Sequence, residues 1–198
     1  MPNYADINGR PMKKLQIEQY LRKLQLNDFE PAVNLATLTK LQDAHLKYIP
    51  YENFDCLNGK ITSLKRQDMF NKVIMHNRGG ICFELNGLYN WLLESLGFDV
   101  TSYSARFIDK METYQLRRHR VMCVALGDKR YLTDVGVNSE SPRVPLEITE
   151  GLIQSDGISQ YKFTRSEFWG WLLWQKERGK IWKRLFGFTE EPQIDKDF

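Results

Sequence analysis

The sequence lacks the features that mark secreted, membrane-spanning and nucleic-acid-binding proteins. Its three cysteines are an odd number at wide spacing, which argues against a disulfide framework and for at least one free thiol. The N-terminus has no charged start followed by an apolar core, so we expect no secretory signal. The longest apolar run, Phe168–Trp174, is far too short to cross a bilayer. These absences predict a cytoplasmic protein with no membrane partner.

An excess of charge of one sign is also missing. Lys and Arg number 28 and Asp and Glu 25, which gives a formal net charge of +3, and no long run of like charges occurs. We therefore expect no nucleic-acid partner, and we interpret the densest basic stretch, Arg117–Arg120, as a solvated face. Histidine is scarce as well, with three residues. Because no CxxC or HExxH spacing occurs, we expect no metal site.

The composition is sufficient for a sizeable core, since 42% of the 198 residues are hydrophobic. Apolar residues in the first half keep helical spacing, and Gly97 is placed as the stop of the last helix. The helices are expected over Ile17–Leu24, Leu35–Tyr48, Phe70–Ile74 and Cys82–Leu96.

After Gly97 the hydrophobic period changes to that of strands. Three strands and a later hairpin are expected over Asp99–Phe107, His119–Leu126, Arg130–Val135, Trp171–Gln175 and Ile181–Phe188. The tail Glu190–Phe198 is polar, so we expect it to be only partly ordered. The order of elements predicts an α+β fold, with a helical domain over 1–97 and an antiparallel β domain over 98–198.

The most informative segment, Arg78–Asn86, places Cys82 after two glycines at the start of a helix. Unpaired N–H groups and a partial positive charge at a helix N-terminus stabilise a thiolate. Glycines allow the backbone to turn sharply and a substrate to approach the sulfur. We therefore interpret Cys82 as a nucleophile, whereas Cys56 and Cys123 fit the more common role of buried hydrophobes.

A thiol nucleophile needs a base, and strand parity favours His119 among the three histidines. If Gly127 and Asp128 form a two-residue turn, Val121 pairs with Asp134, and His119 projects from the same sheet face as Asp134. A three-residue loop would move the carboxylate to the other face, so this inference depends on the turn.

The remaining histidines fit structural roles better. His45 keeps helical spacing with the apolar residues around it, so we expect a hydrogen-bonded core histidine. His76 ends its helix and is expected near the last carbonyls. The hypothesis is thus a triad in which Asp134 orients His119, and His119 takes the proton of Cys82.

Four motifs then occur in a fixed order along the chain. In chain order they are His45–Phe54; the cysteine motif of Arg78, Gly79, Gly80, Cys82, Glu84 and Asn86; His119–Val121 with Thr133–Gly136 and Pro145–Leu146; and Phe188–Pro192. Their residues and order resemble those of the arylamine N-acetyltransferase family, from about residue 15 to the C-terminus.

The resemblance implies a helical first domain and a β-barrel second domain, with a cysteine-protease-like triad of Cys82, His119 and Asp134 at their junction. It implies acetyl-CoA as the acetyl donor, no metal, and ping-pong transfer through an acetylated Cys82 to an arylamine or arylhydrazine. Phe54, Phe83 and Val137 are candidates for the aryl pocket, although core packing explains each of them equally well. No residue is identified for binding CoA.

The chain also departs from the family pattern. Family members continue into a third, mixed α/β region that lines the cleft, and most of that lid is expected to be missing here. Its absence has three alternative consequences: weaker binding of CoA, a cleft open to water, or an apolar face that must pair with another copy in a homo-oligomer. Val137 and Asn138 stand where Phe and Gly are usual, which leaves the acceptor preference open. The alternatives are an acyltransferase or amide synthase with another acyl group, a shortened homologue that binds ligands or a partner, and a thiol hydrolase.

Overall fold

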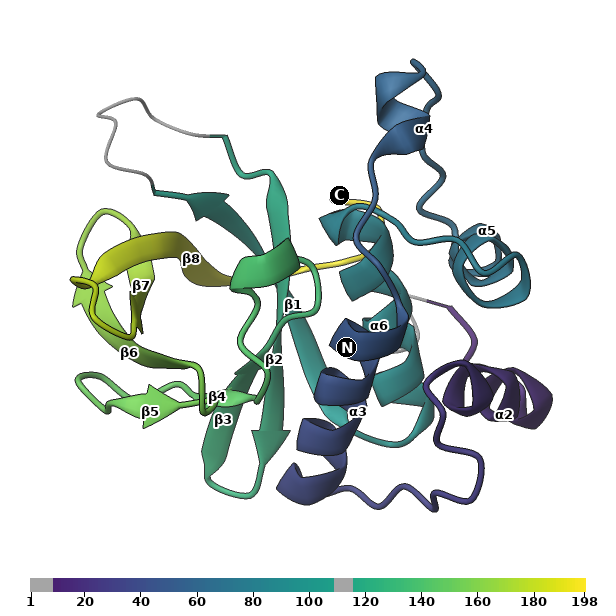
Figure 1. Ribbon diagram of the computed structural model, residues 1–198, viewed down its shortest axis with the longest axis horizontal. Helices are drawn as coiled ribbons and strands as arrows, with labels where there is room; N and C mark the ends of the chain where they lie inside the picture. Colours follow the sequence, from purple (N-terminus) through teal and green to yellow (C-terminus); the bar gives the residue numbers. More distant parts are fainter. Residues whose placement is uncertain (1–8, 109–115) are drawn as a thin grey trace.

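The computed structural model describes residues 9–108 and 116–198, and it separates into a helical part and a sheet (Figure 1). The helices come first in the chain and lie together on one side of the sheet, as the α+β prediction requires. Their bounds are α2 Lys14–Lys23, α3 Leu35–Tyr48, α4 Phe54–Leu57, α5 Arg66–Phe70, the π-helix η1 Asn71–Met75 and α6 Cys82–Ser95. In the described part of the chain, no helix is both long and apolar enough to span a membrane.

The second half forms one antiparallel sheet that curls into a nearly closed barrel (Figure 1). Its strands follow the order β4-β3-β2-β1-β8-β7-β6-β5. Their bounds are β1 Asp99–Phe107, β2 His119–Leu126, β3 Lys129–Thr133, β4 Leu146–Glu147, β5 Gln154–Ser155, β6 Ser159–Ser166, β7 Gly170–Glu177 and β8 Lys183–Gln193, with a 3-10 turn η2 at Asn138–Glu140. The expected α+β class and antiparallel sheet are confirmed.

Local signals set the ends of the two long helices. Asn34 precedes α3, and its side chain accepts a hydrogen bond from the Thr37 N–H over 2.8 Å, which satisfies one of the free donors of the first turn. Pro50 follows its last turn, where a helix cannot continue. Beyond α6, Gly97 has φ +89°, a left-handed conformation that glycine adopts without strain.

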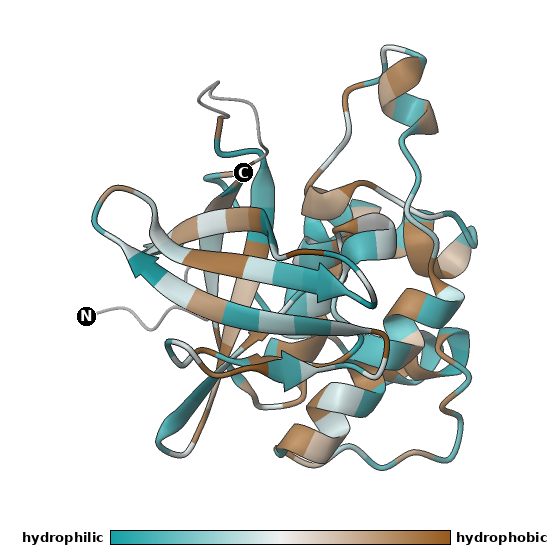
Figure 2. Cartoon of the chain, turned by 60° about the vertical axis from the view of Figure 1, so that its left-hand side comes forward, coloured by the Kyte–Doolittle hydropathy of each residue, from teal (hydrophilic) through white to brown (hydrophobic). Residues whose placement is uncertain are grey.

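The strand β2 divides the interior into two cores, because its side chains alternate between the two faces of the sheet. Met122 and Val124 pack with the buried leucines of the helices. Val121 and Cys123 pack inside the barrel with residues of the other strands. The strands at the front of Figure 2 show a different pattern, in which hydrophobic and hydrophilic residues alternate along the strand. Strand β2 therefore lies at the junction of helices and barrel.

The C-terminal segment differs from its expectation. Strand β8 extends to Gln193, and Asp195 then pairs with Arg66 over 2.7 Å and with Arg120 over 2.9 Å. The ring of Phe198 packs at 5.7 Å from that of Phe83. The prediction of a partly ordered tail was wrong, because two cations and an aromatic ring hold it. The interpretation of Arg120 as solvated was also wrong, since its side chain is buried.

Candidate active site

The glycines before Cys82 allow two backbone segments to lie in direct contact. A Cβ atom on Gly79 would lie 2.0 Å from the carbonyl oxygen of Pro50, a distance that no side chain tolerates. Next to it, Gly80 forms a parallel bridge with Tyr51, and the Glu52 N–H donates to the Gly80 carbonyl over 3.0 Å. The segment that follows α3 thus fixes the loop that leads to Cys82.

Cys82 is the first residue of α6, as predicted, and its side chain is half-buried. The Ile81 N–H before it donates to the Glu84 carboxylate over 3.0 Å, so the side chain of Glu84 caps this helix. Lys72 donates to the other oxygen of Glu84 over 2.8 Å and pairs with Asp55 at 2.9 Å. The capping charge is therefore offset by a lysine beside the helix start.

His119 and Asp134 form a fully buried pair, with 2.6 Å between Nε2 and Oδ2. The register pairs Leu126 with Lys129 and Met122 with Thr133, which confirms the two-residue turn and places both side chains on one face. Burial lowers the pKa of His119, but the Asp134 carboxylate and the interaction with the Cys82 thiol outweigh it and raise the pKa to about 10. The Asp134 carboxylate therefore favours the charged form of the imidazole.

Asn86 holds the carboxylate of this pair, a role that the sequence analysis did not assign. Its Nδ2 donates to Asp134 Oδ1 over 2.8 Å and to the Arg120 carbonyl over 2.6 Å, and its Oδ1 accepts from the Val135 N–H over 2.9 Å. The signal was its place in the cysteine motif, one helical turn after Cys82. Asn86 joins α6 to β2, which begins at His119, and to the segment after β3 that carries Asp134.

Gly136 allows the strand end to reach the sulfur. Its N–H donates to Asp134 Oδ1 over 2.8 Å, and a Cβ atom there would lie 2.9 Å from the Cys82 Cα and 2.8 Å from the Asn86 Nδ2. The second ring nitrogen of His119, Nδ1, has no hydrogen-bond partner among the described residues, and the Cys82 thiol is near enough to shift its pKa. Gly136 and Asn86 thus link the Asp134 carboxylate to the start of α6, which carries Cys82.

The three candidates for the aryl pocket lie in different surroundings. Phe83 follows Cys82 and is half-buried against the ring of Phe198. Val137 follows Gly136 and is buried in the barrel core. Phe54 lies on α4 with 62% of its side chain exposed. The first two are therefore next to the residues that surround the sulfur, and the third is on the surface.

The other cysteines and histidines differ in part from their expected roles. Cys123 is buried, as expected, and burial raises its pKa to about 11. Cys56 is exposed, so its assignment to the core was wrong. His45 is fully buried, but neither ring nitrogen has a hydrogen-bond partner among the described residues, so only its core position was correct. His76 ends η1 with its backbone N–H on the Asn71 carbonyl.

A cavity of about 320 Å³ lies beside the loop that precedes Cys82. Tyr51 in its wall forms the bridge with Gly80, two residues before Cys82, and burial raises the pKa of the Tyr51 hydroxyl. The lining residues are Leu46, Ile49, Pro50, Tyr51, Val135, Ser139, Ser141 and Arg143.

Within residues 9–108 and 116–198, no group of His, Cys, Asp or Glu side chains is arranged to hold a metal ion.

Comparison with known proteins gives a consistent result. A family model described as N-acetyltransferase matches residues 34–198. The arylamine N-acetyltransferase of Mycolicibacterium smegmatis is 36% identical over 180 residues, which cover 88% of this chain and 64% of that protein. The proansamycin X synthase of Amycolatopsis mediterranei is 30% identical over 188 residues, which cover 92% of this chain and 70% of that one.

Among solved structures, the arylamine N-acetyltransferase of Salmonella typhimurium superposes with a TM-score of 0.87 at 27% identity, covering 94% of this chain and 67% of that one. The chain spans less than two thirds of the length of the M. smegmatis relative. Motifs, fold and relatives agree, and the chain belongs to the arylamine N-acetyltransferase family.

Proposed function

We propose that the protein transfers an acetyl group from acetyl-CoA to an arylamine or arylhydrazine, through a thioester on Cys82. The observation that carries the proposal is the buried His119–Asp134 pair, whose carboxylate is bound by Gly136 and Asn86, two residues that connect it to the start of α6 and the half-buried Cys82. Family membership supports the same chemistry. In this proposal Cys82, His119 and Asp134 form the catalytic triad.

In the first half-reaction the Cys82 sulfur attacks the thioester carbonyl of acetyl-CoA. A new carbon–sulfur bond forms, the bond to the CoA sulfur breaks, and the proton held by His119 passes to the departing CoA thiolate. The negative charge on the carbonyl oxygen needs hydrogen-bond donors, and the backbone N–H of Cys82 is the candidate at this helix start. Asp134 stabilises the charged imidazole, and Asn86 keeps the carboxylate in place.

In the second half-reaction the neutral amine nitrogen attacks the acetyl carbon. The carbon–sulfur bond to Cys82 breaks, and His119 takes the proton that the nitrogen loses, which regenerates the resting pair. An aromatic amine suits this step because it is uncharged at neutral pH. Phe83 and Val137 are proposed to contact the acceptor ring, and Phe54 is proposed only as a peripheral contact since it is largely exposed.

The unpaired cysteines bear on the cellular compartment in which the protein works. Cys56, Cys82 and Cys123 are all unpaired, which fits a reducing compartment. We therefore propose a cytoplasmic location, where acetyl-CoA is available as a substrate. The division into a helical domain over 1–97 and a β domain over 98–198 stays a prediction.

The test is the intact mass of the protein after mixing with acetyl-CoA, first without and then with an arylamine. The wild type is expected to gain one acetyl group and to lose it to the amine as the N-acetyl product. Cys82→Ala should stay unmodified with an unchanged circular dichroism spectrum. Cys56→Ala is the matched control, because Cys56 is a more exposed free thiol. Acetylation of a folded Cys82→Ala protein at Cys56 would refute the assignment of the nucleophile.

A second candidate function is amide synthesis with another acyl group. The observation that favours it is the 30% identity to a protein named proansamycin X synthase. The two functions share the Cys82 thioester and differ in the acyl group that enters. Competition between acetyl-CoA and longer acyl thioesters for Cys82, followed by mass, separates them.

A further inference from the structure

Lys72 lies on the π-helix η1 and contacts both ends of the segment 78–84, which carries Cys82. Its carbonyl accepts a hydrogen bond from the Arg78 N–H over 3.1 Å. Its ammonium donates to the Glu84 carboxylate over 2.8 Å. One residue thus holds the start of the glycine loop through its backbone and the first turn of α6 through its side chain.

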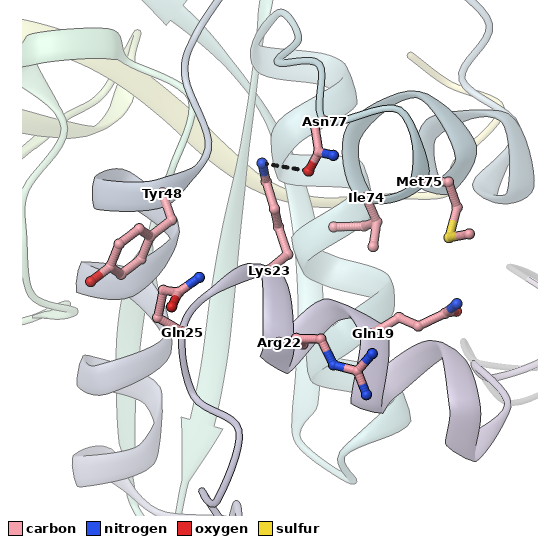
Figure 3. Close-up of a pocket in the computed structure, with 8 residues that line it drawn as sticks. All are labelled: Gln19, Arg22, Lys23, Gln25, Tyr48, Ile74, Met75 and Asn77. Atoms are coloured by element: carbon pink, nitrogen blue, oxygen red, sulfur yellow. Dashed lines mark hydrogen bonds between the residues drawn. The ribbon is translucent and has the colours of Figure 1, made fainter.

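A sharp turn after η1 allows the backbone contact. Ile74 and Met75 lie on η1, and Asn77 follows it with φ +54°, a left-handed conformation (Figure 3). A left-handed residue at the end of a helix turns the chain back toward the last carbonyls. Lys23 of α2 donates to the Asn77 side chain over 3.1 Å, a bond drawn as a dashed line in Figure 3. The Arg78 N–H is thereby brought back to η1.

Glu84 is the group through which Lys72 reaches Cys82. Its side chain is 2% exposed, and its carboxylate caps α6 by accepting from the Ile81 N–H over 3.0 Å. The same carboxylate fills the space left by Gly80, because a Cβ atom there would lie 2.9 Å from its oxygen. A buried negative charge in the turn that begins at Cys82 disfavours a second negative charge on the sulfur. The cap therefore stabilises the helix start and opposes the thiolate at the same time.

Lys72 supplies the compensating charge. Among the residues that the structure describes, it is the one cation that forms an ion pair with Glu84. Burial lowers the pKa of the Lys72 ammonium, but the interactions with Glu84 and Asp55 together outweigh burial and raise it. Lys72 therefore keeps its charge throughout the pH range in which a thiol titrates.

The charges around this pair alternate in sign. Asp55 of α4 pairs with Lys72 at 2.9 Å and with Arg78 at 3.2 Å. Arg78 also pairs with Glu52 at 2.6 Å. These partners are more exposed than Glu84, so solvent screens them more strongly. The other titratable groups around the segment 78–84 are His119, Asp134 and Tyr51.

We propose that Lys72 is a positioning residue for Cys82. Its charge compensates the Glu84 carboxylate, so the cap holds the helix start without opposing ionisation of the thiol. The proposal rests on the proposed function, because it takes Cys82 as the nucleophile. It adds that the reactivity of the sulfur depends on a side chain from η1, which acts through Glu84.

The test measures the rate at which iodoacetamide alkylates Cys82 as a function of pH. Iodoacetamide is uncharged and reacts with the thiolate, so the rate follows ionisation of the sulfur and needs no acetyl-CoA. Trypsin cuts after Lys60 and Arg78, so Cys56 and Cys82 fall in separate peptides that are followed by mass. Lys72→Met should move the midpoint of the Cys82 profile up by about one pH unit and slow alkylation about tenfold below the midpoint.

Further variants separate charge from structure. Lys72→Met/Glu84→Gln removes both charges and keeps an amide oxygen that accepts from the Ile81 N–H, so it should restore the wild-type midpoint to within about 0.3 pH units. Glu84→Gln alone leaves the lysine uncompensated and should lower the midpoint. Lys60→Met is the matched control, because Lys60 also pairs with Asp55, at 3.9 Å, but is 70% exposed. Its profile should be that of the wild type.

The outcomes are distinct. A wild-type midpoint in Lys72→Met, or a midpoint in the double variant as high as in the single one, would overturn the proposal. If circular dichroism shows that Lys72→Met does not fold, Glu84→Gln decides, and a midpoint at or above the wild-type value refutes the role of the charge.

The intact-mass assay with acetyl-CoA separates this proposal from the proposed function. A wild-type protein that gains no acetyl group but shows the dependence on Lys72 refutes the transferase and supports the positioning role. Acetylation of the wild type together with an unchanged alkylation profile in Lys72→Met refutes the positioning role alone.

Discussion

Acid should unfold this protein in part through His45. The imidazole is fully buried on α3, with ring centroids 6.0 Å from Tyr20 and 5.3 Å from Tyr89. Burial lowers its pKa from 6.5 to about 3, because a charged ring would lose its hydration without gaining a partner. The unfolded chain therefore takes up this proton at a higher pH than the folded protein does.

The sign and the size follow from linkage. Since the folded pKa lies below the unfolded one, the contribution of His45 to stability is present above pH 6.5 and is lost as the pH falls toward 3. Each pH unit within that window is worth about 1.4 kcal/mol. Between pH 7 and pH 4.5 the loss from this one residue is about 2.5 kcal/mol, a large part of the 5–15 kcal/mol typical of a folded domain.

The assay compares urea unfolding of the wild type and of His45→Phe at the two pH values. Phenylalanine keeps a flat ring between the tyrosines and removes the titration, so carboxylate effects cancel in the difference. The wild type should lose about 2.5 kcal/mol more than the variant. His76→Phe, a change at an exposed histidine, should behave as the wild type does. Equal losses in wild type and His45→Phe would refute the argument.

Three further predictions concern the active site and its supports. Gly136→Ala should cost roughly 1–3 kcal/mol and lower the rate of Cys82 acetylation, because its Cβ would overlap Cys82 and Asn86. Urea unfolding measures the stability and intact mass the acetylation, and a variant that keeps both at the wild-type values would contradict the close contact. Asp195→Asn should lower the free energy of unfolding in urea by about 2–4 kcal/mol, because it leaves the largely buried Arg66 and Arg120 without this carboxylate. The control Glu191→Gln, in an exposed ion pair with Arg117, should change it by less than about 1 kcal/mol. His119 should stay protonated up to a pH of about 10 in an NMR titration of the folded protein, and titration near 6.5 would contradict its pairing with Asp134. Its contribution to stability should therefore be complete below pH 6.5 and be lost as the pH rises through 10.

The residues of the candidate active site were more predictable from the sequence than the residues that hold distant segments of the chain around it. The contact of His119 with Asp134 follows from the turn at Gly127 and Asp128, because a two-residue hairpin fixes register and register fixes the face. Cys82 at a helix start follows from the glycines before it. These are local rules that act over a few residues, so one sequence suffices to apply them.

The missed features depend on partners distant in the chain. From its polar composition the tail is expected to be solvent-exposed. The sequence does not show that Arg66 and Arg120, from two different elements, both pair with Asp195. Strand β6 was not predicted, although Tyr161 and Phe163 alternate toward the barrel core, because the polar residues between them weaken the pattern. The exposure of Cys56 also depends on how the short helix α4 projects from the bundle.

The two-residue hairpin also bears on how the chain folds. His119 and Asp134 are 15 residues apart, and Asn86 and Asp134 are 48 apart, so short loops close the site. By contrast, β1 pairs with β8 from the far end of the chain, and a side-chain hydrogen bond between these strands, from Ser104 to Gln193, spans 89 residues. Loop-closure entropy grows with the length of chain enclosed, so the long pairing is the costlier one to nucleate. Slow steps in refolding should therefore report the closing of the barrel, on a sheet that already holds its histidine and aspartate together.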